Sequence, residues 1–356
     1  MRSRGAIFCA FGAAAFAALG AAAESGDTDP ALALASKRAE AAVPDVRLIA
    51  TSIPDARDNA PAALVLVPEG WKIEGQVTWN PSVTTLPEIR ISVRDENDGR
   101  EILLLPRREF VWRFADDPQS PRPLSSAGLE QKPPLGDAVV FLERELVPAL
   151  HSSSPRIEIL EREPLPQIAR AAAAGGASTK DHRDVSAARV RTTTNENGAS
   201  RDEDVYCVLV QSRTPAAGEE LIRWGPELVY VLRAKPGELA RASGLLETIA
   251  ASFRIDPAWW NRNAAPAIAD RQRRERGLED ATSLRERVSA ALAAHYGRTE
   301  VYFDPRTERE VRLPSGYQHA WANARGDYLL SSDSARDPRT EDSAGGWGEL
   351  HAVSAR

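Results

Sequence analysis

The sequence contains few of the residues that cross-link a fold or carry out covalent chemistry. Its 356 residues include two cysteines and five histidines. Cys9 lies inside an N-terminal apolar run, so Cys207 is the single cysteine beyond that run. No intrachain disulfide can then form, even in an oxidising compartment. The chain must be held together by hydrophobic burial, and its length is typical of about two domains.

The chain also lacks an apolar run that could span a bilayer comfortably, since a spanning helix needs roughly 20 residues. A shorter run, of about 15 residues, follows the basic start MRSRG and ends at small residues, which is the pattern of a secretory signal. We predict a signal peptide over residues 1–23 and a flexible mature N-terminus over 24–44. We expect export to the periplasm or the extracellular medium, and no integral membrane segment after signal removal.

A strong excess of positive charge is absent as well. The formal net charge is −6, and it becomes −8 when cleavage removes Arg2 and Arg4 and no acidic residue. A mildly acidic chain has no electrostatic attraction for nucleic acid, so we predict no nucleic-acid partner. The stretch RQRRERGLEDATSLRER is nearly balanced in charge and is typical of a solvated, ion-paired helix face.

What is present is a clear alternation of apolar and polar residues, which predicts a mainly antiparallel sheet. The segment EIRISVRDENDGREILLLP alternates, turns at NDG and returns, as a β-hairpin does. The apolar runs DVYCVLVQ and ELVYVLRA predict two further strands. Two polar stretches, 177–187 and 193–203, lack such a pattern and are expected to be loops.

Helical spacing of apolar residues predicts helices around this sheet. One helix begins at the N-cap Asp137 and ends at Pro148, a second spans PLPQIARAAAAGG, and a third carries Leu246 and Phe253 on one face. The predicted class is α+β, with a mainly antiparallel sheet flanked by helices as an α/β/α sandwich, plus a long helix and a small β-rich C-terminal module. The predicted boundaries are 45–258 for the sandwich, 259–297 for the connecting helix and 298–356 for the small β-hairpin module.

The phrases LVPEGWKIEGQVTWN, before the predicted hairpin, and LLETIAASFRID, in the third helix, resemble the PsbP/Mog1-like group. The resemblance covers about 45–257, and the chain departs from the group through a long polar insertion between 150 and 203. The C-terminal phrase LPSGYQHAWANARGDYLLSSDSARDP is similar to the tail of uncharacterised exported bacterial proteins. These resemblances imply a non-catalytic sandwich domain that serves assembly or binding.

The same C-terminal phrase holds the residues on which chemistry or binding would depend. Ser315 lies in a Pro-Ser-Gly turn four residues before His319, which is a weak match for a hydrolase because the sequence has no GxSxG elbow. In an extended strand, Tyr317, His319 and Trp321 would share one face. Together with Tyr328 they are the candidate binding residues. The alternative interpretation is that these rings only pack against their neighbours.

We predict no metal site and no bound cofactor. The histidines occur singly and far apart, and the C-terminal acidic residues lack the spacing of a calcium loop. Those acidic residues are Asp333, Asp337, Glu341 and Asp342. Cys207 lies in an apolar strand and is expected to be buried and inert. Trp259 and Trp260 are expected to fill space between the first domain and the long helix.

These features favour an exported, non-enzymatic protein that acts in binding or assembly in the cell envelope, with an envelope protein, a peptide or a glycan as partner. No catalytic residue is assigned. Two alternatives stay open. A secreted hydrolase around Ser315 and His319 requires a hydrogen bond from the serine hydroxyl to an imidazole that a carboxylate holds. A carbohydrate or peptide binder requires Tyr317, Trp321 and Tyr328 side by side in a groove.

Overall fold

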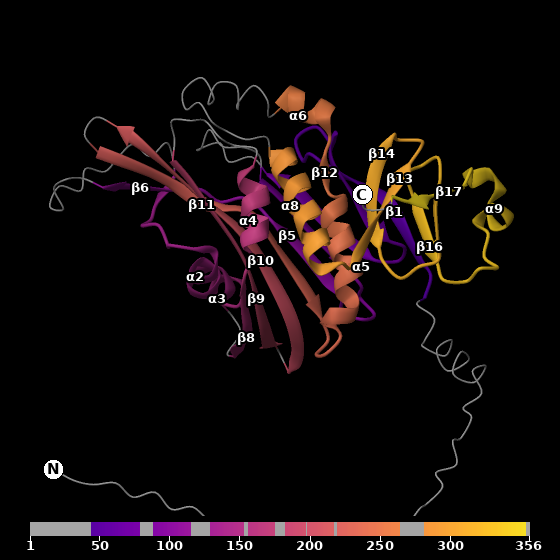
Figure 1. Cartoon of the computed structure of the whole chain (residues 1–356), viewed down its shortest axis with the longest axis horizontal. Coiled ribbons are helices and arrows are strands. Elements are labelled where there is room, and N and C mark those ends of the chain that lie inside the picture. Colours follow the sequence, from indigo (N-terminus) through magenta and orange to yellow (C-terminus); the bar gives the residue numbers. More distant parts are fainter. Residues whose placement is uncertain are drawn as a thin grey trace, which may run out of the picture. The chain divides into compact units, whose positions relative to one another are not determined.

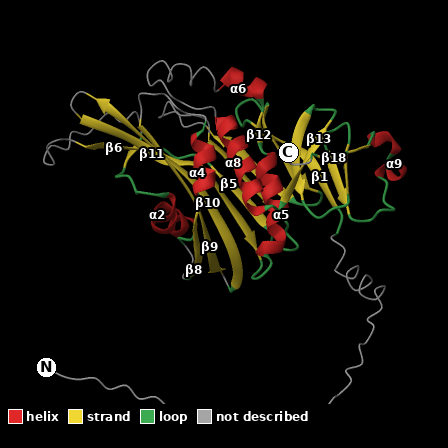
Figure 2. Cartoon of the chain, in the orientation of Figure 1, coloured by secondary structure: helices red, strands yellow, loops and turns green. Residues whose placement is uncertain are grey.

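The structure is a computed structural model that describes residues 44–78, 88–114, 129–152, 156–174, 182–196, 198–216, 219–263 and 281–353. The predicted signal peptide, nearly all of the predicted flexible N-terminus and the middle of the predicted connecting helix lie outside the described residues. The described residues belong to one compact unit. Figures 1 and 2 show its strands and helices. None of the described helices is long and apolar enough to cross a membrane.

A nine-stranded sheet runs through the larger part of this unit, in the order β3-β4-β5-β11-β10-β9-β8, with β6 paired to the far end of β11 and β7 paired to β6. The β6–β7 pair is parallel and the others are antiparallel. The predicted hairpin is confirmed, with Ile91 opposite Leu104. The strands are β3 (Lys72–Thr78), β4 (Glu88–Arg94), β5 (Glu101–Leu105), β6 (Phe110–Phe114), β7 (Glu130–Gln131), β8 (Ile157–Pro164), β9 (His182–Glu196), β10 (Ala199–Ala216) and β11 (Glu219–Ala234).

The prediction of loops over 177–187 and 193–203 is wrong for their described residues, because β9 and β10 pair through them. Polar cross-strand partners replace the missing hydrophobic alternation. Thr193 donates a hydrogen bond to Asp202 Oδ1 over 2.9 Å, and such pairs stabilise neighbouring strands. The available signal was the sequence NENG, whose Gly198 adopts a φ of +84°, a conformation that favours glycine and is common in hairpin turns.

Helices cover both faces of the nine-stranded sheet, which confirms the predicted α/β/α sandwich (Figure 2). Along β10, Tyr206 and Val208 face one core, and Val205 and Cys207 face the other. Burial on both sides explains the near-continuous apolar run DVYCVLVQ. One core contains α4 (Pro166–Ala173), α5 (Leu239–Ser252), α6 (Pro257–Asn263) and α8 (Ala281–Tyr296), and the other contains α2 (Ala138–Phe141), the π-helical η1 (Leu142–Leu146) and α3 (Val147–Leu150).

The helix predicted to end at Pro148 continues to Leu150. Its start is as expected, because Asp137 accepts a hydrogen bond from the N–H of Val140 over 2.9 Å. The π-helical turn that precedes α3 places Pro148 in the first turn of a new α-helical segment. A first-turn proline is tolerated, since its missing N–H would have no intrahelical partner there.

A six-stranded sheet joins the first described strand to the C-terminal residues, in the order β12-β2-β1-β16-β15-β17. Val46 lies opposite Leu330, and Leu48 lies opposite Tyr328. Residues predicted to form a C-terminal module, 298–356, therefore share a sheet with the predicted sandwich, and their folding as a separate module stays a prediction. The strands are β1 (Val46–Pro54), β2 (Pro61–Pro68), β12 (Arg254–Ile255), β15 (His319–Ala322), β16 (Tyr328–Ser331) and β17 (Gly348–Glu349).

A three-stranded sheet, ordered β14-β13-β18, packs against the six-stranded sheet. Leu48 and Leu330 of the six-stranded sheet contribute to one apolar core with Val311 and Leu313 of the three-stranded sheet. This core ties the C-terminal strands to the rest of the fold. The remaining elements are β13 (Thr299–Asp304), β14 (Arg309–Pro314), β18 (His351–Ala352), α9 (Pro338–Glu341) and the 3₁₀-helical η2 (Ser343–Gly345).

We expect Leu48→Ala to lower the free energy of unfolding by about 2–5 kcal/mol, because a fully buried leucine leaves a cavity when truncated. Urea unfolding measures the change. The matched control is Leu160→Ala on β8, where the side chain is 49% exposed and we expect a loss below ~0.5 kcal/mol. Equal losses in the two variants would contradict the central place of β1.

Candidate functional site

Two of the predicted binding residues, Trp321 and Tyr328, lie on opposite faces of the six-stranded sheet. Trp321 pairs across the strands with Leu329 and packs with it and Trp347. Tyr328 belongs to the core on the other face, where its hydroxyl donates to Asp304 Oδ2 over 3.1 Å. Both rings are buried. They therefore do not stand side by side in a groove.

The other two, Tyr317 and His319, flank the start of β15. Tyr317 packs in the core between the two smaller sheets and donates from its hydroxyl to Pro44 O over 3.3 Å. His319 stacks on Trp321, with ring centroids 5.4 Å apart, and its Nδ1 lies 3.0 Å from Glu349 Oε1. Tyr317 does not share the face of Trp321, because it packs against the core on the other side of the sheet. A binding role for these residues stays a prediction.

The serine and histidine of the hydrolase alternative are not hydrogen-bonded to each other. Ser315 lies in the turn after β14, where its N–H donates to Arg298 O over 3.1 Å. Among residues 281–353, no hydrogen bond joins the Ser315 hydroxyl to an imidazole, whereas Glu349 does hold His319. One of the two contacts that such a site requires is therefore present. Within the described part of the chain, no group of three or more metal-ligating side chains occurs.

Cys207 and Trp259 serve the core, as expected. Cys207 is buried, and burial raises the pKa of its thiol, which keeps it protonated and unreactive at neutral pH. Trp259 has no exposed surface, and its indole N–H donates to Asp55 Oδ2 over 3.0 Å. Its neighbour Trp260 packs partly buried against the same core.

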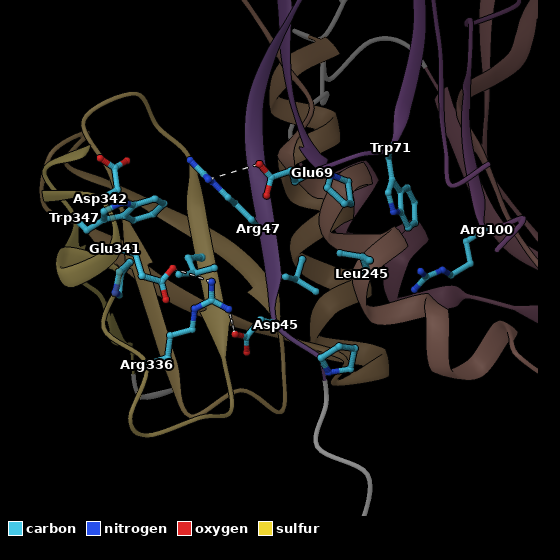
Figure 3. A pocket seen from close by; sticks show the side chains of 15 residues that line it. Asp45, Arg47, Glu69, Trp71, Arg100, Leu245, Arg336, Glu341, Asp342 and Trp347 are labelled. Atoms are coloured by element: carbon cyan, nitrogen blue, oxygen red, sulfur yellow. Dashed lines mark hydrogen bonds and ion pairs between the residues drawn. The ribbon is translucent and has the colours of Figure 1, made fainter. Parts of the chain in front are cut away.

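A cleft of about 430 Å³ lies where β1, the turns that follow β2 and β4, helix α5 and residues 336–347 meet (Figure 3). Trp71 lies on one side and Trp347 on the other, with Leu245 of α5 between them. These segments are far apart in the sequence, and the six-stranded sheet brings them together. The cleft is therefore a product of the tertiary fold.

Two arginines of the cleft are committed to carboxylates. Arg336 donates to Asp45 and, over 3.1 Å, to Glu341, and the hydrogen bond with Asp45 is the main cause that raises the pKa of Arg336. Arg100 donates to Asp95 Oδ2 over 2.7 Å. Charge-assisted hydrogen bonds of this kind fix the plane of the guanidinium. Both arginines thus belong to the frame of the cleft.

Arg47 is less committed. Its Nη1 lies 3.6 Å from Glu69 Oε1, which is too long for a hydrogen bond. Its guanidinium lies over the Trp347 ring, 5.6 Å from the centroid. Among the described residues, no hydrogen bond from this guanidinium is found. The cleft thus presents one incompletely satisfied cation beside one exposed carboxylate, with apolar surface behind them.

No motif in the sequence marks these cleft residues. Trp71 lies within the phrase that carried the family resemblance, but nothing in the sequence links it with Trp347, 276 positions later. Arg47 and Glu69 are ordinary surface types at unremarkable spacing. A signal for this site therefore exists only in the way the strands pair.

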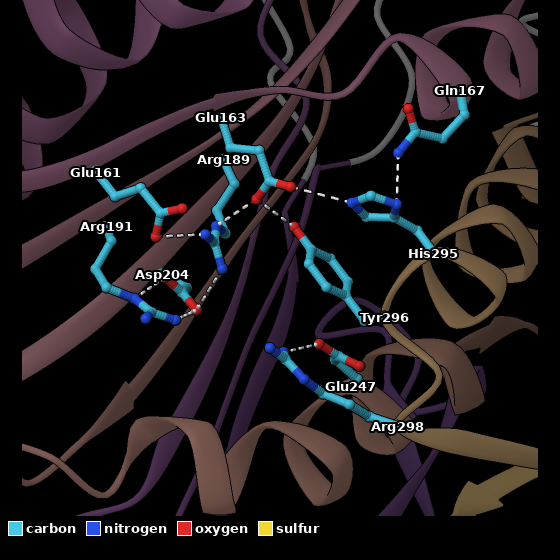
Figure 4. Close-up of polar contacts among 10 residues, drawn as sticks. All are labelled: Glu161, Glu163, Gln167, Arg189, Arg191, Asp204, Glu247, His295, Tyr296 and Arg298. Carbon is cyan, nitrogen blue, oxygen red and sulfur yellow. Dashed lines mark hydrogen bonds and ion pairs between the residues drawn. The ribbon is translucent and has the colours of Figure 1, made fainter. Parts of the chain in front are cut away.

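A second group of polar side chains lies between the nine-stranded sheet and α8 (Figure 4). Arg189 on β9 is nearly buried and meets three carboxylates, at 2.6 Å from Glu161, 2.9 Å from Glu163 and 3.7 Å from Asp204. Glu163 also accepts from the Tyr296 hydroxyl over 2.9 Å. This cluster surrounds the buried guanidinium with opposite charge, although its Nε makes no hydrogen bond among the described residues, and it fastens the end of α8 to the sheet.

His295 and Arg191 extend the same cluster in opposite directions. His295 Nε2 lies 3.0 Å from Glu163 Oε1, and its Nδ1 lies 2.6 Å from the Gln167 amide of α4. Arg191 donates twice to Asp204, each time over 2.8 Å, in the bidentate geometry that suits a carboxylate. All these contacts are made within the fold, and the cluster is a structural network.

Glu247 on α5 lies beside this network and is incompletely hydrogen-bonded. Its Oε1 accepts from Arg298 over 2.8 Å, but its Oε2 is buried and has no hydrogen-bond partner among the described residues. Burial raises the pKa of Glu247 to about 7, against the opposing effect of Arg298, while Asp204 raises it and Arg189 lowers it. Between these two values, 4.5 and about 7, the side chain is thus largely protonated where an exposed glutamate is charged.

We expect wild-type stability to fall relative to Glu247→Gln as the pH rises. The folded-state pKa is about 7 and the ordinary value is 4.5, so the folded state binds more protons between them. The stabilisation that the bound proton gives is complete below pH 4.5, and it is lost as the pH rises through about 7. Urea unfolding at pH 5 and pH 8.5 should show a relative change of about 3 kcal/mol.

The control for this prediction is Glu238→Gln, which changes an exposed glutamate at the start of the same helix. Its free energy of unfolding should stay within ~0.5 kcal/mol of the wild type at both pH values. If Glu247→Gln behaves in the same way, Glu247 ionises freely in the folded protein and the argument from its burial is wrong.

No family model matches the chain, and no curated protein matches it by sequence. Among solved structures, it is similar to cyanobacterial PsbP from Synechocystis sp. PCC 6803, at 15% identity and a TM-score of 0.22, over 58% of this chain and 93% of that one. It is also similar to LpqN of Mycobacterium tuberculosis, described as involved in cell envelope biogenesis, at 15% identity and a TM-score of 0.21, over 59% of this chain and 92% of that one. The predicted resemblance to the PsbP group is thus confirmed as a weak likeness of fold.

Proposed function

We propose that this is an exported, non-enzymatic binding protein of the cell envelope, and that its ligand site is the cleft between β1, α5 and residues 336–347. The cleft itself is the observation that carries this proposal. Its volume of about 430 Å³ falls within the range of small-molecule sites. It combines two tryptophans, an apolar floor and charged groups of both signs, a composition that suits a polar organic molecule or a short peptide.

The side chains of the cleft support binding over catalysis. The described lining contains no serine, threonine, cysteine, histidine or lysine, the residue types that supply most nucleophiles and bases. Two of its carboxylates, Asp45 and Glu341, are hydrogen-bonded to Arg336. Both carboxylates are thus engaged within the frame of the cleft.

The place of action follows from the signal peptide predicted over residues 1–23. An exported chain meets the peptides, glycans and proteins of the envelope. Trp71, which is partly buried, offers an amphipathic ring for such molecules, since its apolar face and N–H group serve different parts of one ligand, and the buried Trp347 lies behind Arg47.

The test is to fill the cleft. Leu245→Trp adds bulk at its floor without removing a charge, so we expect it to weaken ligand binding at least about tenfold. The probes are a panel of amino acids, di- and tripeptides, and disaccharides, and the readout is the shift of the melting temperature. The matched control is Leu160→Trp on the exposed edge of β8, which is outside the cleft and should bind like the wild type.

Two results would contradict the proposal. One is that no panel member stabilises the wild-type protein. The other is that Leu245→Trp, shown to be folded by circular dichroism, binds the same panel members with unchanged affinity. Stabilisation of the wild type and the Leu160→Trp control alone would support it.

A further inference from the structure

Arg47 and Glu69 are held side by side by the backbone and not by their side chains. The N–H of Glu69 donates to the carbonyl of Arg47 over 2.8 Å, which fixes the two residues relative to each other. Their charged groups are nevertheless 3.6 Å apart, and the side chains are 32% and 58% exposed. Among the described residues, neither side chain has a hydrogen bond. The backbone therefore fixes the spacing of the pair, but the two side chains are not hydrogen-bonded to each other.

The guanidinium of Arg47 also contacts Trp347. Its Cζ lies over the Trp347 ring, and its Nε is buried without a hydrogen-bond partner among the described residues, so the two terminal Nη groups are the donors left for a ligand. Arg336 in the same cleft differs, because both of its Nη groups donate to carboxylates, those of Asp45 and Glu341. Arg47 is thus the arginine that can accept a ligand without breaking an existing hydrogen bond.

We propose that this pair binds a zwitterionic α-amino acid with an apolar side chain, with the carboxylate on Arg47 and the ammonium on Glu69. This inference rests on the proposed function of the cleft. In an α-amino acid the two charged groups sit on one carbon, so they lie as close together as the charges of Arg47 and Glu69. The apolar side chain then lies against Leu245 and Leu329 on the cleft lining.

Charge balance favours a zwitterionic amino acid over a molecule that carries only a carboxylate or only an amine. A carboxylate alone would bind beside the uncompensated charge of Glu69, and an amine alone would bind beside Arg47. Like charges placed together in a partly desolvated site are costly, whereas a zwitterion pairs both residues and leaves the complex with no added charge. The carboxylate on Arg47 forms the charge-assisted, two-bond arrangement that guanidinium favours.

The experiment measures binding of L-leucine, leucinamide and N-acetyl-leucine to the full mature chain by isothermal titration calorimetry. The wild type should bind leucine at least about tenfold more tightly than either derivative, because each derivative loses one charge-assisted contact. Arg47→Gln should abolish the preference over leucinamide and keep the preference over N-acetyl-leucine. Glu69→Gln should do the opposite. Arg241→Gln, which changes an exposed arginine of α5 outside the cleft lining, is the matched control and should keep both preferences.

The inference is overturned if the wild type binds leucine and its derivatives equally, or if both preferences survive in Arg47→Gln and Glu69→Gln. It is also overturned, while the proposed function stands, if leucine fails to bind and a peptide or disaccharide binds in a manner that Leu245→Trp weakens. Failure of every probe, or indifference to Leu245→Trp, removes the proposed function and this inference together.

Discussion

The pairing of β1 along both of its edges is the constraint on which the rest of the structure depends. Its residues bond to β2 on one side and to β16 on the other, so the first described strand holds the last part of the chain in place. Because side chains alternate along a strand, Arg47 faces the cleft while its neighbour Leu48 enters the core. A slip of one residue would exchange the two, burying a charge and exposing a leucine. The hydrophobic pattern of β1 therefore also fixes the geometry of the cleft.

Helix α5 connects the cleft with the interior. Leu245 lines the cleft, and two residues further on Glu247 meets Arg298 beneath the sheet. The interior there is polar, but its charges are paired. Arg189 is surrounded by carboxylates, and Asp204 is held in bidentate contact by Arg191. Such pairing offsets the desolvation cost of burial without adding much net stability. The cluster chiefly specifies where α8 ends on the sheet, because a misplaced helix would leave these charges unpaired.

The parts of this fold that sequence predicts are those fixed by neighbours along the chain. The β4–β5 hairpin, the cap at Asp137 and the stripe on α5 each depend on short-range patterns. The two stretches mistaken for loops, 177–187 and 193–203, fail this rule, since their described residues are stabilised by polar partners on the facing strand and not by alternation. The predicted helix end at Pro148 is wrong because a π-helical turn, which has no clear mark in sequence, lets the helix continue.

In the candidate site, the difference between what neighbours along the chain determine and what strand pairing determines is larger still. The C-terminal phrase suggests a site because its aromatic and polar residues are adjacent in sequence, yet Trp321 and Tyr328 lie on opposite faces of the sheet. The cleft residues carry no motif, because they come from separate segments that only β1 and its two partners bring together.

The ion pairs around the cleft differ in whether the two charged groups are hydrogen-bonded to each other. This difference distinguishes the pairs that hold the cleft in shape from the pair proposed to bind a ligand. Where carboxylate and guanidinium are hydrogen-bonded, as between Arg100 and Asp95, the donors are used and the geometry is fixed. Where the backbone sets the spacing but the charges stay beyond hydrogen-bond distance, as between Arg47 and Glu69, both groups keep unused capacity. A ligand that bridges them gains two charge-assisted contacts and needs little reorganisation of the protein. A binding site is expected to hold its charged groups at a fixed spacing while leaving their hydrogen-bonding capacity unused. In this cleft, Arg47 and Glu69 have this property.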